Sequence, residues 1–139
     1  MERLPFLRKL FDLDPKTEII AWRESIFCVQ DIEARFRESV KYLTSAGVQA
    51  GNPVLLKADY SPRAISIFLA LLQIRAIIIP LLPSTADHSP ELIKIVDPVW
   101  ILDLAEGKDV SLCARRAPHT NNLYKKLHSE NHPGLVLFT

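Results

Sequence analysis

The longest apolar stretch of the sequence, Ala64 to Leu82 (AISIFLALLQIRAIIIPLL), restricts most strongly what this chain can fold into. It is long enough to cross a bilayer. However, Gln73 and Arg75 fall in its middle, and a central arginine costs about 2.5–3.5 kcal/mol on membrane insertion. If the stretch is divided into a buried helix and a buried strand, no charge has to enter lipid. The sequence therefore predicts a soluble domain without a membrane span.

Helical and strand patterns alternate along the chain. Ser61 can cap the helix within the apolar stretch, and Pro62 suits its first position. A short helix is predicted after Ser89. Strands are predicted at Pro53–Asp59, Ala76–Pro83 (ending near Pro80, which cannot donate to a ladder), Val99–Asp103 and Leu135–Phe138. This alternation predicts an α/β fold, with layered helices on a mainly parallel sheet and right-handed crossovers.

The first 47 residues predict three more elements. Apolar residues at helical spacing in residues 4–11 predict a surface helix that packs on its own domain. Glu18–Trp22 and Ser25–Val29 then predict a β-hairpin. An amphipathic helix follows, with Asp31 as its N-cap and Gly47 at its end. A weakly patterned segment, residues 104–133, contains one possible short helix near its end.

Composition excludes several classes of protein. The 139 residues suffice for one domain, and the net charge of +1 gives no reason to propose nucleic acid or an anionic membrane as a partner. Cys28 and Cys113 match no metal spacing. Cys28 lies in an apolar run, which favours a reduced core thiol in a cytoplasmic protein.

Histidine and basic residues offer few candidate sites. His128 and His132 have the spacing of two metal ligands on one helix face, but Pro133 and Gly134 follow at once and no third ligand stands near. Solvated loop residues are the favoured interpretation for these two, as for His88 and His119. The pair Arg115–Arg116 could hold a phosphate, although a solvated pair in a loop is the favoured interpretation.

Two carboxylates stand where α/β folds often keep functional groups. Asp59 and Asp103 each follow a predicted strand. A turn residue or helix cap is the favoured interpretation of both. The phosphate-loop patterns GxGxxG and GxxxxGK[ST] and the nucleophile pattern GxSxG are absent from the sequence. Taken alone, these residues identify no catalytic group and no metal site.

The order of motifs from Tyr42 to Pro83 (YLTSAGVQAGNPVLLKADYSPRAISIFLALLQIRAIIIPLLP) resembles the amino-terminal part of AMP-forming acyl-CoA synthetases and related adenylate-forming enzymes. Those enzymes have a helix ending in L..xGV..GD.V, a strand, a turn of the type N-S-P, a buried helix and then A…(I/V)PL.P. The matching residues here are Gly47, Val48, Gly51, Val54, Ser61, Pro62, Ala70, Ala76, Pro80, Leu81 and Pro83. The segment VWILD is similar to the family's next strand, so the resemblance covers residues from about 18 to 139.

The segment Gly134–Thr139 (GLVLFT) resembles the strand that enters the family's phosphate-binding loop, of the form T-S-G-[ST]-T-G-x-P-K-G. The resemblance implies that Thr139 is the first residue of this loop and a nucleotide-binding position. It also implies an amino-terminal helix and lead-in at residues 1–17 and an α/β subdomain of an AMP-binding domain at residues 18–139, truncated at the start of the loop. Arg75 departs from the family, which often has glycine there, and so suggests a different turn.

The parent enzyme implied by this resemblance is an ATP-dependent acid–thiol ligase of the kind found in fatty acid metabolism. It would use ATP and Mg²⁺, form an acyl-adenylate and transfer the acyl group to CoA or to a carrier-protein thiol. The chain alone is expected to be inactive and to bind no cofactor. Its expected partners are the remainder of the parent or a complementing chain, and self-association is expected. The alternatives are a stand-alone binding or scaffold module, one half of a split ligase, or an unrelated α/β domain.

Overall fold

The computed structural model describes residues 2–104, 109–115 and 122–138. Its helices are α1 (Pro5–Phe11), α2 (Val29–Ala46), α3 (Pro62–Ile74), α4 (Pro83–His88), α5 (Pro90–Val96) and α6 (Asn122–Ser129). Its strands are β1 (Glu18–Trp22), β2 (Ser25–Cys28), β3 (Pro53–Lys57), β4 (Ile77–Leu81), β5 (Trp100–Asp103), β6 (Ser111–Ala114) and β7 (Gly134–Leu135). This arrangement confirms the predicted α/β class with a mainly parallel sheet.

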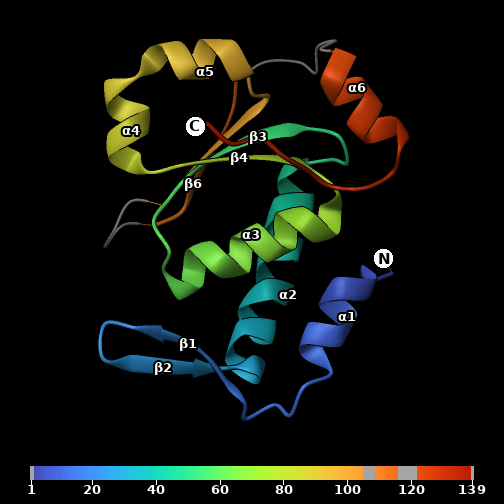
Figure 1. Ribbon diagram of the computed structural model, residues 1–139, viewed down its shortest axis with the longest axis vertical. Helices are drawn as coiled ribbons and strands as arrows, with labels where there is room; N and C mark the ends of the chain where they lie inside the picture. Colours follow the sequence, from blue (N-terminus) through green and yellow to red (C-terminus); the bar gives the residue numbers. More distant parts are fainter. Residues whose placement is uncertain (1, 105–108, 116–121, 139) are drawn as a thin grey trace.

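The main sheet has the strand order β6-β5-β3-β4-β7, and β1 and β2 form a separate antiparallel hairpin. Strand β3 is central and pairs in parallel with β4 and β5, while β7 adds in parallel at one edge. The other edge is β6, which pairs antiparallel with β5. Figure 1 shows α2 and α3 on one side of this sheet and α4, α5 and α6 on the other.

Side chains alternate between two apolar cores because successive residues of a strand point to opposite faces. The larger core joins the sheet to α1, α2 and α3, and the smaller one joins it to α4 and α5. The strand residues in the larger core are Val54, Leu56, Ile78 and Leu102, and those in the smaller core are Leu55, Ile79 and Leu81.

The apolar stretch forms helix α3 and strand β4, as predicted. The Ser61 hydroxyl accepts a 3.2 Å hydrogen bond from the Ala64 N–H, and Pro62 is the first helical residue. The described residues contain no helix that is long and apolar enough to cross a membrane.

Arg75 ends helix α3 with φ 64° and ψ 36°, the left-handed conformation that glycine usually supplies. The prediction of a different turn at Arg75 was therefore wrong.

Helix α2 begins earlier than the sequence suggested. Cys28 is the N-cap and Asp31 is the third helical residue, so the prediction of Asp31 as N-cap was wrong. The two residues form a reciprocal capping box, in which the Asp31 carboxylate accepts the Cys28 N–H at 3.0 Å. Its pKa is lowered, chiefly by the side-chain hydrogen bond with Cys28. Gly47 ends the helix with φ 107°, as predicted.

Strand β4 continues through Pro80, contrary to the prediction that the strand ends there. Ala76 and Ile78 accept hydrogen bonds from Gly134 and Val136 of the β7 segment, at 3.1 and 2.9 Å. Backbone groups alternate sides along a strand, so the missing N–H of Pro80 also faces β7. Proline thus interrupts the ladder with β7 and leaves the ladder with β3 intact. This geometry explains why β7 is a two-residue strand and not the four-residue strand predicted.

Two elements had no counterpart in the sequence-based prediction. Helix α4 starts at Pro83, a residue that had been assigned to the end of the preceding strand. Strand β6 lies in the segment that showed only weak patterning. Helix α6, in contrast, occupies the position of the possible short helix.

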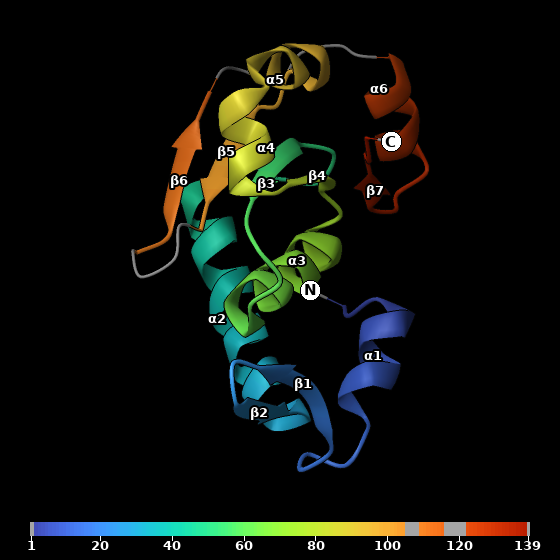
Figure 2. The same ribbon diagram turned by 60° about the vertical axis from the view of Figure 1, so that its left-hand side comes forward.

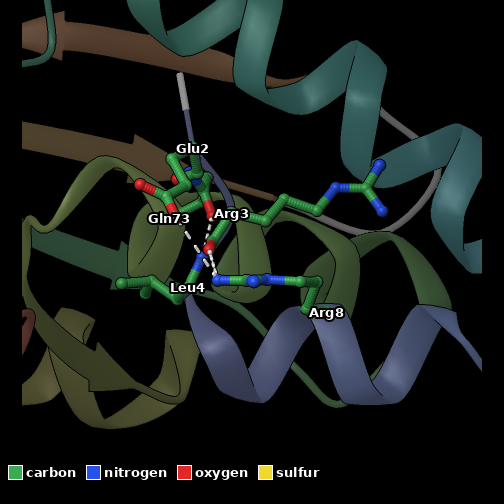
Figure 3. Close-up of polar contacts among 5 residues, drawn as sticks. All are labelled: Glu2, Arg3, Leu4, Arg8 and Gln73. Atoms are coloured by element: carbon green, nitrogen blue, oxygen red, sulfur yellow. Dashed lines mark hydrogen bonds and ion pairs between the residues drawn. The ribbon is translucent and has the colours of Figure 1, made fainter.

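The amino-terminal segment is fixed to the domain by a buried amide. Gln73 of α3, which is 3% exposed, accepts the Leu4 N–H at 3.0 Å and donates to the Glu2 carbonyl at 2.7 Å. Figure 3 shows the side chain between these two backbone groups. The Arg3 guanidinium also pairs with Glu33 of α2 at 2.9 Å. Helix α1 buries Leu7 and Phe11 against its own domain, as predicted, and packs against α2, below α3 in the view of Figure 2.

Candidate binding groove at the carboxyl edge of the sheet

The connections that follow β3 and β4 pass to opposite faces of the sheet. After β3 it passes to α3 on one face of the sheet, and after β4 it passes to α4 on the other face (Figure 1). Such a switch in direction separates the connections at the carboxyl ends of two neighbouring parallel strands, and α/β proteins bind ligands in the resulting crevice. The fold therefore places a candidate site between the ends of β3 and β4.

A groove of about 510 Å³ occupies this position. It is mainly apolar, and the polar side chains in its lining are those of Asp59, Tyr60 and Thr85. Its apolar lining comes from the strand ends, α3 and the β7 segment, and consists of Leu56, Ala58, Ala64, Ile65, Phe68, Pro80, Leu81, Leu82, Leu135, Leu137 and Phe138. This volume suits a small organic ligand or an apolar segment of protein. None of its described lining residues is cationic.

Beside the groove, Lys57 links three elements. This residue ends β3, and its ammonium lies 2.5 Å from an Asp87 oxygen and 3.5 Å from an Asp103 oxygen. The hydrogen bond to Asp87 is the largest influence on the pKa of Lys57, which is raised although partial burial opposes the shift. The ammonium therefore stays protonated at neutral pH, so Lys57 joins the strand end to α4 and does not serve as a base.

The two predicted carboxylates have different roles. Asp59 accepts the Ser61 N–H at 3.0 Å, which confirms its role as a turn residue that leads into α3. Asp103 belongs to β5 and pairs with Lys57. The interpretation of Asp103 as a turn residue or helix cap was therefore wrong. Arg115 pairs with Asp97, while Arg116 lies outside the described residues. The structure thus brings Asp59 and Asp103 to the same sheet edge but gives them separate partners.

The histidines whose side chains are described do not converge. Helix α6 ends at Ser129, so His128 and His132 do not share a helix face. His132 bonds to Glu130 at 2.8 Å and to the Pro133 carbonyl at 2.9 Å, and His88 lies 2.7 Å from the Ser84 carbonyl. His119 lies outside the described residues. Within residues 2–104, 109–115 and 122–138 no group of three potential ligands could hold a metal ion.

Both cysteines are free thiols. Cys28 is only partly buried, and its sulfur lies 3.0 Å from an Asp31 oxygen, so the prediction of a core thiol was wrong. Cys113 is exposed on the edge strand β6.

Thr139 lies outside the described residues, so its assignment as a nucleotide-binding position stays a prediction. The residues that sequence reasoning missed are Lys57, Tyr60 and Thr85. The only available signal for Lys57 and Tyr60 was their position near the end of a predicted strand, which also singled out Asp59. Thr85 lies in α4, a helix that the sequence did not reveal.

No protein-family model matches this sequence, and no curated protein does. Several solved structures share its fold. The N-terminal subdomain of NpsA from Klebsiella oxytoca superposes with a TM-score of 0.66 at 14% identity, over 78% of this chain and 29% of that chain. The artificially fused adenylation–PCP di-domain NRPS NpsA-ThdA from the same organism gives 0.63 at 15% identity, over 68% and 18%. IdnL1 gives 0.62 at 20% identity, over 88% and 28%.

The chain therefore has the fold of the N-terminal part of adenylation enzymes, as its resemblance to adenylate-forming enzymes predicted. It spans less than a third of the length of these neighbours. At such identities the likeness establishes the fold alone.

Proposed function

We propose that this chain is the amino-terminal part of an ATP-dependent ligase that converts a carboxylic acid to an acyl-adenylate and transfers the acyl group to a thiol. The observation that carries the proposal is the fold shared with the NpsA subdomain over 78% of the chain. The motif order from Tyr42 to Pro83 supports the same family independently of the coordinates.

In this proposal the chain is a scaffold and supplies no catalytic group. The polar side chains in the described lining of the groove are those of Asp59, Tyr60 and Thr85, which do not suit a polyphosphate because none is cationic. The nearest ammonium, that of Lys57, is engaged by two carboxylates. Binding of ATP and Mg²⁺ is therefore assigned to other parts of the ligase, and Thr139 is proposed as the residue of this chain nearest to them.

The remaining polypeptide of the ligase is proposed to cover the carboxyl-edge groove. Exposed apolar side chains gather there and on the adjoining β7 segment, including Tyr60, Leu82, Leu135 and Leu137. Exposed apolar surface of this kind is typical of an interaction site. The same surface favours a second candidate, one half of a split ligase whose other half is a separate chain.

A carrier-protein thiol is the favoured acyl acceptor, because one structural neighbour is an adenylation domain fused to a PCP domain. A CoA thiol is the alternative, and it follows from the motif resemblance. Acyl transfer from the adenylated product to each acceptor would distinguish the two.

The proposal can be tested by sequencing the gene beyond the codon for Thr139 and assaying its full product. We expect the frame to continue into Ser-Gly-[Ser/Thr]-Thr-Gly and then Pro-Lys-Gly. We also expect ATP–pyrophosphate exchange by the full product with at least one carboxylic acid and none by residues 1–139 alone. A continuing frame without this loop, or a full product inactive toward a broad acid panel, would refute the proposal. A stop codon after Thr139 would leave the split ligase and the stand-alone module, and co-purification of a complementing chain that carries the loop would select the split ligase.

A further inference from the structure

Helix α4 forms one wall of the carboxyl-edge groove. Leu82, the N-cap of this helix, and Thr85 line the groove together with Ile65 and Phe68 of α3. Figure 1 shows α3 and α4 on opposite sides of the sheet. The width of the groove therefore depends on the position of α4 relative to the strand ends.

One buried methyl group packs α4 onto the smaller core. Of the six residues of α4, Ala86 is the one whose side chain is buried, and it contacts the cluster that contains Leu55, Ile79 and Leu81. A methyl group removes little apolar surface from water, so it stabilises the docking of a helix much less than a leucine side chain does. Elements with few buried apolar contacts open at a low free energy, without unfolding of the whole domain.

The two ends of α4 allow it to move as a unit. Pro83 and Pro90 are the first residues of α4 and α5, and the residue before a proline is biased away from helical backbone. Leu82 and Ser89, which precede these prolines, form no side-chain cap hydrogen bond. The two junctions therefore separate α4 from β4 and from α5, and they are the positions at which the backbone can turn.

An ion pair fastens α4 to the end of β3. The Lys57 ammonium lies 2.5 Å from Asp87 of α4 and 3.5 Å from Asp103 of β5. The Lys57 side chain is 20% exposed, so salt screens the pair less than it screens a fully exposed one. If α4 moves away, Lys57 retains Asp103 as a partner, and Asp87, already 60% exposed, becomes solvated. Opening therefore leaves no unpaired charge buried.

We propose that α4 is a movable wall of the carboxyl-edge groove, held in its closed position by the ion pair between Lys57 and Asp87. Leu81 lines the groove and also belongs to the smaller core that contains Ala86, so the groove adjoins the space beneath α4. Opening widens the groove toward Ile79 and admits a larger apolar group. The movement controls access to the surface that the rest of the ligase is proposed to cover, but it does not depend on the ligase activity.

Substitution of the two carboxylates tests the ion pair, because both lie near Lys57 and only Asp87 belongs to α4. Hydrogen exchange of the 139-residue chain, followed by NMR, would measure opening at the amides of residues 86–88. In D87N we expect this exchange to be roughly tenfold faster than in the parent, because a charge-assisted hydrogen bond is lost. D103N is the matched control. It keeps the pair between Lys57 and Asp87 and should change the exchange by less than about twofold.

Binding of an apolar dye tests whether the groove widens. The dye 1-anilinonaphthalene-8-sulfonate binds exposed apolar surface and should bind D87N several-fold more tightly than D103N. Each variant removes one carboxylate near Lys57, so the change in charge is matched. Urea unfolding of both variants verifies that their global stability is comparable.

Three results would overturn the proposal. They are equal exchange in D87N and D103N, acceleration in D87N that extends to α3, and faster exchange at α4 with no change in dye binding. The first would show that the pair does not hold α4, the second that the whole domain unfolds, and the third that the helix frays without widening the groove. Pyrophosphate exchange plays no part in these measurements, so their outcome is independent of the ligase proposal.

Discussion

The Leu4 N–H donates a 3.0 Å hydrogen bond to the side-chain oxygen of Gln73, across 69 positions of sequence. The amide nitrogen of the same side chain donates to the Glu2 carbonyl at 2.7 Å. The oxygen and the nitrogen of one buried side-chain amide thus both hold the segment that leads into α1 (Figure 3). This relationship makes a glutamine, within an otherwise apolar helix, the attachment point of the amino terminus.

Replacing Gln73 with leucine should release α1. The variant keeps a similar side-chain volume but leaves the Leu4 N–H and the Glu2 carbonyl without their partner, which costs about 1–3 kcal/mol of unfolding free energy. Urea denaturation would measure this loss, and hydrogen exchange should accelerate in residues 5–11. Gln30→Leu is the matched control, because Gln30 is exposed on α2. Equal stability of Q73L and the parent would show that the amide does not hold the segment.

Two of the helix ends with left-handed backbone, Gly47 and Arg75, should respond oppositely to substitution. Gly47→Ala places a Cβ at φ 107°, with Trp100 no nearer than 3.7 Å, so backbone strain and not a clash should cost about 1–2 kcal/mol. Arg75→Gly relieves the same strain and should raise stability by up to about 1 kcal/mol, less the contribution of the Arg75 hydrogen bond to Asn131. Thermal and urea unfolding would compare the pair. A loss of stability in R75G would show that the side-chain contact outweighs the strain.

His132 should titrate above its usual pKa of 6.5. The Pro133 carbonyl is the largest cause and the Glu130 carboxylate is the next, and both ring nitrogens can donate to these acceptors only when the imidazole is protonated. The folded state therefore gains stability below pH 6.5 and loses it as the pH rises through the raised pKa. An NMR pH titration of the imidazole would measure the shift. Glu130→Gln should reduce the shift without abolishing it, and an unchanged pKa in this variant would contradict the assignment.

Self-association through the β7 segment remains a prediction. Leu137, which follows the edge strand β7 (Gly134–Leu135), is 64% exposed, and open sheet edges with apolar side chains tend to pair. Analytical ultracentrifugation at micromolar concentration should show dimers or larger species, and Leu137→Asp should shift them toward monomer. Ile26→Asp is the control, because Ile26 is similarly exposed (59%) but lies on the distant hairpin. A monomeric parent chain would refute the prediction.

The sequence predicted correctly those helices and strands that a short stretch of neighbouring residues determines. The hairpin, α2, α3 and the three main parallel strands follow from periodicity, caps and β-branched runs. Helix α4 was missed because a six-residue helix shows little periodicity and because Pro83 was taken for the end of a strand, although proline also favours the first helical position. Strand β6 was missed because its pairing with β5 depends on a partner distant in sequence.

The candidate sites depended on topology and could be predicted only in part. Asp59 was identified because it follows a strand, but Thr85 joins it only because the chain leaves β3 and β4 toward opposite faces. Nothing in the spacing of these residues along the sequence indicates that they lie together.

The attachment of the amino terminus to Gln73 also sets an order of events during synthesis. Leu4 is translated 69 residues before Gln73, a delay of roughly 3–14 s at about 5–20 residues per second. The segment 2–11 leaves the ribosome long before its anchor does, with Leu7 and Phe11 still uncovered. This interval is when a chaperone or a protease has access to the amino terminus, and it closes once α3 has emerged.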